Sequence, residues 1–325
     1  MRTLILWLLG FVALGIVCVA LVLLRPLEVQ QQTTHLGLFL AHVQSNYVMT
    51  AEGRVHYYEA EPDVPGLGIP LVLVHGLGDR SEAWAPMIKQ LRRDGFHVYA
   101  PDLLGYGRSP KPSGSDYSIA TQEQFVADFI RALGLQKTDI GGWSMGGWVT
   151  LRLALDHPEL IARVVVYDAA GLKYDLSFPA TVFHPTDAAE LRRLQLLLEP
   201  RSGPLPGFIA RDALHKFAGE QWVIDRGMDS MLTGHDIVDD RMSSFPEPLL
   251  IVWGADDHLI PLSVAERMHS LDPRSELDIV EGCGHLAPAL CTTRVAAAPS
   301  AFLKAIPAPN GGEHTLPMPN PITAR

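Results

Sequence analysis

Four glycines surround one serine in the stretch DIGGWSMGGWVTLRLALDHPEL, residues 139–160. A glycine inside a strand or helix costs roughly 1 kcal/mol relative to alanine. Two glycine pairs around Ser144 therefore indicate a backbone geometry that only glycine permits. Residues 142–146 also fit the pattern G-x-S-x-G, which is typical of a sharp turn from a strand into a helix that holds the serine strained and exposed. We expect that turn here, although five residues alone fit an ordinary glycine-rich turn equally well.

Apolar stretches that predict strands alternate with stretches of helical periodicity on both sides of this turn. Strands that are apolar on both faces and alternate with helices of about 12 residues are typical of a parallel sheet covered by helices on both sides. We therefore predict an α/β fold with a mostly parallel sheet. The predicted strands lie at 54–61, 70–76, 97–105, 137–144, 161–171, 248–254 and 275–282, and the helices between the earlier ones lie at 81–95, 119–135 and 145–158.

The alternation stops between residues 172 and 248, where only helical patterns occur. A block of helices inserted between two strands must lie over one edge of the sheet, so we predict an all-helical cap that covers a site. The sheet core then comprises residues 48–171 and 249–306. Residues 307–325 are rich in Pro, Gly and Asn and have little apolar periodicity, so we expect a disordered tail.

An uninterrupted apolar run, LILWLLGFVALGIVCVALVLL, occupies residues 4–24 and is followed by Arg25. About 20 apolar residues span a bilayer core, whereas a cleaved signal peptide has an apolar region of roughly 7–15 residues. We expect residues 1–25 to be a single transmembrane anchor, with a signal peptide as the alternative. The flanking charges leave the side of the catalytic domain open.

Residues 26–47 are predicted to link this anchor to the sheet core. Within them, HLGLFLAHV has the composition of a short amphipathic helix on the membrane surface. Packing against the domain as an ordinary helix is an equal alternative.

Ser144 requires a base, and the base requires an acid that orients it. On an α/β sheet with this turn, the order along the chain is serine, acid, histidine. His285 follows the last predicted strand in EGCGHLAP and is the candidate base. The stretch WGADDHLIP ends another strand and offers Asp256 and Asp257, of which we choose Asp257. Asp168, at the end of VVVYD, is the rival acid.

The oxyanion of an acyl-transfer intermediate needs backbone N–H donors that are already in place. One is expected from Met145, which follows the serine at a helix N-terminus. The second is expected from Leu77, in the loop after LVLVHG. His75 in that loop is assigned a structural role, because it ends a buried strand.

Five stretches that occur in order resemble the signature stretches of the α/β-hydrolase superfamily, over residues 54–306: HGLGDRSEAW, DLLGYGRS, GWSMGG, WGADDHLIP and GCGHLAP. The sequence AAGL, the segment HPTDAAELRRLQLL and the N-terminal anchor further resemble membrane-anchored monoacylglycerol-lipase-like hydrolases. The resemblance implies the triad and the oxyanion donors named above. It implies a serine hydrolase of carboxylic esters.

Aromatic residues in the cap and near the turn predict an apolar substrate site. We expect Trp143, Phe183 and Phe208 to contact the substrate, and Trp84 to add aromatic surface near the oxyanion loop. A lipid-derived acyl ester such as a monoacylglycerol fits this site. A carbon–carbon bond hydrolase and a cofactor-free perhydrolase remain alternatives on the same triad, and a non-catalytic binding protein is the alternative from another class.

Charge and cysteine content limit the partners. The formal net charge is −10 and no basic patch is visible, which argues against nucleic acid. No C-x-x-C spacing occurs, so we expect no metal site. We also expect no cofactor and a monomer. Of the three cysteines, Cys283 and Cys291 bracket His285 and are expected to be free buried thiols. A bridge between them is the alternative if the domain faces an oxidising compartment.

Overall fold

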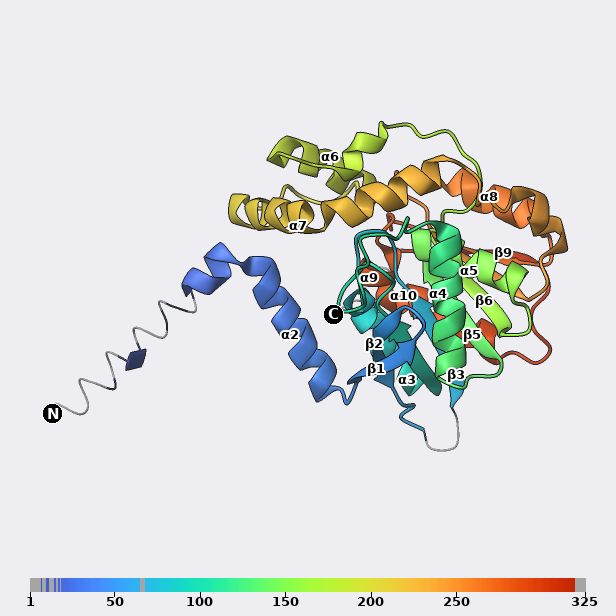
Figure 1. Cartoon of the computed structure of the whole chain (residues 1–325). Coiled ribbons are helices and arrows are strands. Elements are labelled where there is room, and N and C mark those ends of the chain that lie inside the picture. Colours follow the sequence, from blue (N-terminus) through green and yellow to red (C-terminus); the bar gives the residue numbers. More distant parts are fainter. Residues whose placement is uncertain are drawn as a thin grey trace.

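A nine-stranded sheet forms the centre of the computed structural model, which describes residues 19–64 and 68–318 together with residues 7, 10, 11, 15 and 17. Its order within the described chain is β1-β2-β4-β3-β5-β6-β7-β8-β9 (Figure 1). β1 and β2 pair antiparallel, as do β2 and β4, and all other neighbours are parallel, which confirms the mostly parallel sheet. The strands are β1 (Gln44–Thr50), β2 (Gly53–Ala60), β3 (Ile69–Val74), β4 (Phe96–Pro101), β5 (Thr138–Trp143), β6 (Ile161–Tyr167), β7 (Leu249–Gly254), β8 (Glu276–Val280) and β9 (Gly312–Leu316).

Two hydrophobic cores lie on opposite faces of the sheet. Successive strand residues point to opposite faces, so in β3 Val72 and Val74 join one core while Leu71 and Leu73 join the other. The first core is closed by α4 (Ile119–Ala132), α5 (Met145–Asp156) and α8 (Leu262–Leu271). The second is closed by α3 (Ala85–Arg93), which follows η1 (Ser81–Trp84), and by α9 (Ala287–Leu290) and α10 (Thr292–Lys304).

The chain between β6 and β7 forms helices and no strand, at the position where we predicted the cap. It contains η2 (Ala180–Phe183), α6 (Ala188–Leu198), α7 (Gly207–Leu232) and η3 (Asp239–Ser244). α6 and α7 lie together across one end of the sheet (Figure 1). The Asp187 side chain caps α6 by accepting hydrogen bonds from the N–H groups of Ala189 and Glu190, both at 2.8 Å.

The segment before the sheet is helical. Residues 19–24 are helical and lead into α2 (Pro26–Leu40), which begins with a proline at its first position. The linker predicted at residues 26–47 is therefore mainly this helix and the start of β1. Leu38 is buried in the second core, which means that HLGLFLAHV packs on the domain, whereas Phe39 stays 73% exposed.

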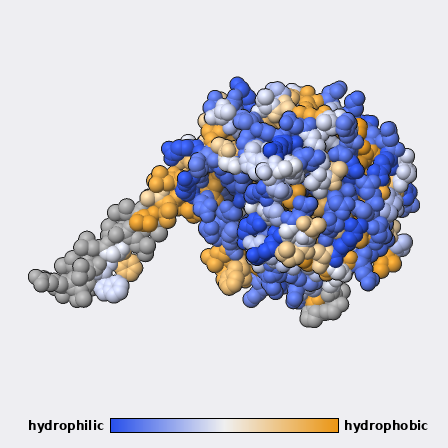
Figure 2. Space-filling model, in the orientation of Figure 1, coloured by the Kyte–Doolittle hydropathy of each residue, from blue (hydrophilic) through white to orange (hydrophobic). Residues whose placement is uncertain are grey.

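Ten of the 21 residues of the predicted membrane span, residues 4–24, fall outside the described residues. Among the residues that are described, no helix has the length and apolar character needed to cross a membrane. Most of the described residues of this segment are apolar and exposed, in contrast to the largely hydrophilic surface of the domain (Figure 2).

The C-terminal tail is ordered in part, so the prediction of disorder is wrong for residues 312–316. These residues form β9, which pairs parallel with β8 at the edge of the sheet. The N–H of Glu281 also donates to the carbonyl of Leu316, at 3.1 Å. An edge strand is held mainly by backbone hydrogen bonds, so its composition does not reveal it.

Candidate active site

Ser144 lies between β5 and α5 with φ 57° and ψ −121°, a conformation that is strained for any residue except glycine. Its N–H donates to the carbonyl of Tyr167 at 2.9 Å, and its own carbonyl accepts from the N–H groups of Gly147 and Ala170 at 3.0 and 3.1 Å. The backbone of the serine is therefore fixed by β6 on one side and by α5 on the other. The predicted strand–turn–helix is present.

The glycines around Ser144 are required by close backbone approaches. A Cβ on Gly142 would lie 2.2 Å from the carbonyl oxygen of Gly146. A Cβ on Gly146 would lie 2.3 Å from the carbonyl oxygen of Val74, and one on Gly147 would lie 2.4 Å from the Cβ of Ala169. No ordinary side chain fits at these distances, so α5 packs against β3 and β5 closely enough to carry only glycine there.

His285 and Asp257 form a buried pair. His285 follows β8, Asp257 follows β7, and the Nδ1 of His285 lies 2.8 Å from Oδ2 of Asp257. The other oxygen of Asp257 accepts hydrogen bonds from the N–H groups of Leu259 and Ile260, at 2.8 and 2.9 Å. Because an ionised carboxylate only accepts, Nδ1 carries the proton and Nε2 remains available as a base.

The two other candidate acids have different partners. Asp256 forms an ion pair with Arg201 from the cap, with 2.7 Å between Oδ2 and Nη2. Asp168 is fully buried after β6, and its Oδ1 accepts from the N–H of Gly254 at 2.8 Å. Burial, with the neighbouring Asp257 carboxylate, raises the pKa of Asp168 well above its ordinary value. Of the three, Asp257 is the one that contacts His285.

The predicted oxyanion donors, the N–H groups of Leu77 and Met145, lie in two segments next to Ser144. Leu77 lies in the loop after β3, and Met145 is the first residue of α5. A Cβ on the adjacent Gly76 would lie 3.1 Å from the Cβ of Ser144, so this loop passes directly over the serine. Within the described chain, neither the N–H of Leu77 nor that of Met145 donates a hydrogen bond to another group.

His75 holds the loop in place, as we predicted. Its Nδ1 lies 2.8 Å from the carbonyl of Gly76, and its Nε2 accepts from the N–H of Leu103 at 3.0 Å. Burial lowers the pKa of His75, which keeps the imidazole neutral and able to accept. The histidine therefore joins the loops after β3 and β4.

Two cavities meet at Ser144, with volumes of about 510 and 430 Å³. Leu77, Ser144, Phe183 and Leu259 line both. His285 and Trp143 line the larger cavity, together with apolar residues of the cap and α2: Leu27, Leu194, Leu198, Phe217 and Ile224. The smaller cavity extends beneath α7, among Trp148, Leu172, Leu176, Met228, Met231, Leu232, Ile237 and Ile260.

Of the four predicted aromatic residues, two line the cavities and two do not. Phe183 lines both cavities, and Trp143 lines one while its Nε1 donates to the carbonyl of His285 at 2.8 Å. Phe208 lines neither cavity, because it lies at the second position of α7, away from the part of that helix over Ser144. Trp84 is fully buried and packs edge-on against Trp143 and Tyr167, so it offers no surface to a substrate.

Sequence reasoning missed several residues of the cavity walls, among them a set on α7. Phe217, Ile224, Met228 and Met231 line the cavities. Their spacing of 3, 4 and 7 residues is the signal of one helical face and could have identified them.

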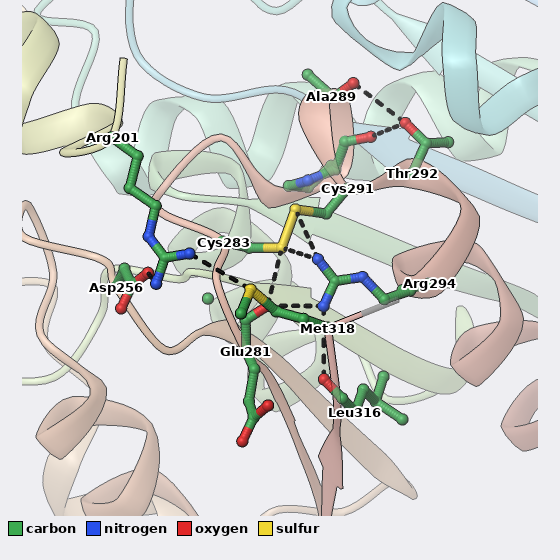
Figure 3. The surroundings of a disulfide bond; sticks show 12 residues. Arg201, Asp256, Glu281, Cys283, Ala289, Cys291, Thr292, Arg294, Leu316 and Met318 are labelled. Atoms are coloured by element: carbon green, nitrogen blue, oxygen red, sulfur yellow. Dashed lines mark hydrogen bonds and ion pairs between the residues drawn. A yellow bond between two sulfur atoms is a disulfide. The ribbon is translucent and has the colours of Figure 1, made fainter. Parts of the chain in front are cut away.

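Cys283 and Cys291 form a disulfide, so the expectation of two free thiols is wrong (Figure 3). The short helix α9 returns the chain after His285 and brings the two Cα atoms within 6.4 Å of each other. Arg294 also lies against the bridge, with Nη2 at 2.8 Å from the Sγ of Cys283 (Figure 3). The bridge therefore encloses the loop that carries His285.

Alkylation under denaturing conditions tests this bridge. Cys18 is the remaining cysteine, so the full chain is expected to take up one alkyl group without reductant and three with it. The sequence separation is 8 residues, and closing such a loop stabilises the fold by roughly 2–3 kcal/mol in the chain-entropy relation. In the control Cys18→Ser, the numbers become zero and two. Uptake of three groups without reductant would show that no bridge forms.

Known proteins with similar sequences share the α/β-hydrolase fold that this geometry indicates. A model of the alpha/beta hydrolase fold matches residues 69–199. The 2-hydroxymuconate semialdehyde hydrolase of Pseudomonas putida is 30% identical, over 68% of this chain and 82% of the relative. Lipase 3 of Moraxella sp. (strain TA144) is 27% identical, over 67% of this chain and 72% of the relative.

A solved structure shares the fold over nearly the whole chain. It is described as a membrane phospholipase A and a bacterial virulence factor, and it superposes with a TM-score of 0.75 at 24% identity, over 93% of this chain and 98% of that one. The family match, the relatives and the sheet with its strained serine turn agree. The chain belongs to the α/β-hydrolase superfamily.

Proposed function

We propose that this hydrolase cleaves carboxylic esters of lipid-derived acyl chains, such as monoacylglycerols, with Ser144 as its nucleophile. The observation that carries the proposal is the buried His285–Asp257 pair, in which Nδ1 and Oδ2 are 2.8 Å apart. His285 lines the same cavity as the strained Ser144. A serine, a histidine and a carboxylate in this arrangement constitute the machinery for acyl transfer.

The proposed reaction has two half-reactions. The Nε2 of His285 takes the proton of Ser144 while Oγ attacks the ester carbonyl, and the resulting oxyanion accepts hydrogen bonds from the N–H groups of Leu77 and Met145. His285 then gives the proton to the leaving alcohol, which breaks the ester bond and leaves an acyl-enzyme. Water, activated by the same nitrogen, releases the acid. Asp257 holds the imidazole and stabilises its charged form.

The walls of the two cavities favour an apolar substrate with two arms. An acyl chain in the cavity beneath α7 would contact Met228, Met231 and Ile237, and each buried methylene contributes about 0.8 kcal/mol to binding. The larger cavity, bounded by Leu27 and Phe217, would hold the alcohol. Because both cavities reach Ser144, the ester bond would lie where the arms join.

A carbon–carbon bond hydrolase is the second candidate, since a relative at 30% identity is a 2-hydroxymuconate semialdehyde hydrolase. A muconate substrate carries a carboxylate, which needs a cation in the site. Among the described residues that line the two cavities, Lys173 is the only lysine or arginine, and it is exposed. The lack of a buried lysine or arginine among the described residues of these walls supports an ester substrate over a 2-hydroxymuconate semialdehyde.

We also propose that residues 4–24 anchor the enzyme in a membrane, on the strength of the uninterrupted apolar sequence. The anchor continues through residues 19–24 into α2, whose Leu27 lines the catalytic cavity. The mouth of the site would thus lie close to the bilayer. The Cys283–Cys291 bridge favours a catalytic domain on the oxidising side of that membrane.

A series of p-nitrophenyl esters from C2 to C18 tests the substrate class. We expect kcat/KM to rise from C2 to at least C8, since each methylene adds about 0.8 kcal/mol of burial before losses. Phe183→Asp is expected to lower kcat/KM for the long esters, because it places a charge in both cavities. Phe208→Asp is the matched control and is expected to leave the profile unchanged.

Two results would reject this proposal. A flat profile with acetate esters preferred would indicate a general short-chain esterase. Turnover of a 2-hydroxymuconate semialdehyde, with esters left intact, would favour the carbon–carbon hydrolase.

A further inference from the structure

A second pocket, of about 570 Å³, lies between α2 and α7 and shares a wall with the catalytic cavity. Leu27 of α2 lines both hollows. On α7, Lys216 and Val223 line the second pocket, whereas their neighbours Phe217 and Ile224 line the catalytic cavity. We call this space the α2–α7 pocket. It adjoins the site of the reaction without containing Ser144.

Basic side chains from three separate segments converge on the α2–α7 pocket. Arg80 follows the oxyanion loop, Lys111 lies in the loop before α4, and Lys216 lies on α7. Arg80 pairs with Glu220, with 3.1 Å between Nη2 and Oε1. Within the described part of the chain, neither lysine forms an ion pair with a carboxylate, although Lys111 donates to the carbonyl of Gly105 at 3.1 Å.

The other charged residues of the lining comprise one ion pair and one exposed carboxylate. Arg25 and Asp212 lie 3.6 Å apart as an ion pair, and Asp212 also accepts from the N–H of Leu27 at 2.9 Å. Glu28 is exposed and accepts from the amide of Gln32 at 2.8 Å. The charged residues of the lining without an ion pair in the described chain are therefore Lys111, Lys216 and the exposed Glu28, which leaves an excess of positive charge.

The cations of the pocket repel one another. Lys216 keeps an exposed surface, but partial desolvation lowers its pKa, and the positive charge of Arg80 lowers that pKa further. The same two causes lower the pKa of Lys111, opposed by Glu220 and Asp102. The carboxylates of Glu220, Asp79 and Glu82 oppose the lowering of the pKa of Lys216. An anion that entered the pocket would further relieve the repulsion between the cations.

We propose that the α2–α7 pocket binds the phosphate of a glycerophospholipid or lysophospholipid whose acyl ester lies at Ser144, an inference that rests on the proposed ester hydrolase function. Lysine binds phosphate as a point charge, and arginine can add a directed hydrogen bond. In these lipids the glycerol backbone separates the phosphate from the ester by only a few bonds. The phosphate must therefore lie beside the catalytic cavity, as this pocket does.

The test compares two substrates with the same C12 acyl chain, a lysophosphatidylglycerol and a monoacylglycerol, on the full chain. In Lys111→Gln/Lys216→Gln, kcat/KM for the lysophospholipid is expected to fall by roughly 10- to 100-fold, while kcat/KM for the monoacylglycerol stays within about twofold. Lys89→Gln/Lys137→Gln is the matched control, since it removes the same charge from exposed positions outside the pocket.

Equal losses on both substrates, or no loss on either, would overturn the proposal. Thermal unfolding in inorganic phosphate separates a lipid headgroup from a free anion. In one outcome, phosphate raises the Tm of the unmodified protein but not that of the double variant, while the double variant cleaves each lipid as fast as the unmodified protein does. In that case the pocket binds free phosphate and the headgroup proposal is wrong. If the protein cleaves no ester at all, the proposed function is contradicted instead. The change in Tm with inorganic phosphate then still tests whether the pocket binds an anion.

Discussion

Ser144→Ala is expected to lower kcat for ester hydrolysis by on the order of 10³–10⁶-fold and to abolish covalent labelling by a fluorophosphonate probe. His285→Ala should cause a loss of the same size, because nucleophile and base act as a unit. Both variants should keep the Tm of the unmodified protein within a few degrees, since each removes few atoms. Steady-state kinetics on a p-nitrophenyl ester and gel fluorescence of the labelled protein provide the measurements.

Three aspartate variants test the identity of the acid. Asp257→Asn should lower kcat somewhat less than the loss of Ser144, because it removes the carboxylate that contacts His285 at 2.8 Å. Asp256→Asn is the matched control, since it weakens only the ion pair with Arg201. Asp168→Asn is expected to have a small effect, because burial and Asp257 favour the neutral form of this carboxyl.

A severe loss in Asp256→Asn, or in Asp168→Asn alone, would show that the acid is assigned to the wrong residue. Full labelling of Ser144→Ala would place the activated serine elsewhere in the chain and would contradict the proposed mechanism as a whole.

Gly146→Ala is expected to destabilise the fold by at least about 3 kcal/mol, or to prevent folding, and to eliminate activity. The added Cβ would lie 2.3 Å from the carbonyl oxygen of Val74 and 2.4 Å from that of His75. Both atoms belong to the backbone at the end of β3, so neither can move aside alone. Moving α5 away from β3 would also displace Ser144 and the oxyanion loop.

The matched control is Gly207→Ala, at the start of α7, where a Cβ meets no atom within 4 Å. That variant should be as stable as the unmodified protein or slightly more so, because alanine favours a helix. Urea unfolding of both variants, followed by circular dichroism, makes the comparison. A Gly146→Ala protein with unchanged stability and kcat would mean that α5 and β3 are not packed as closely as described.

The sequence by itself determined the sheet and the position of the serine turn. The strands around it are apolar on both faces, and burial on both faces is the condition of a parallel sheet. Only glycine fits at positions 142 and 146, because a Cβ there would lie within 2.4 Å of a backbone carbonyl oxygen. The glycines in the sequence therefore mark this close packing. The apolar runs and the G-x-S-x-G pattern consist of residues close together in the chain, so they can be read directly, although the contact that requires glycine at 146 is made with Val74 and His75.

The tertiary structure decided which of several similar residues occupies the site. Asp256 and Asp257 are adjacent in the sequence, yet one pairs with Arg201 of the cap and the other with His285. Phe183 and Phe208 have the same chemistry, and only Phe183 reaches the cavities. The direction of a loop side chain depends on contacts with segments distant in the chain, which no local pattern records.

The same reason explains the remaining differences between prediction and structure. The Cys283–Cys291 bridge depends on how α9 returns the chain, and β9 depends on an open edge of β8. The α2–α7 pocket collects Arg80, Lys111 and Lys216 from three segments that show no cluster of charge in the sequence. Local periodicity specifies strands and helices, whereas pairs between distant segments exist only once those strands and helices are packed together.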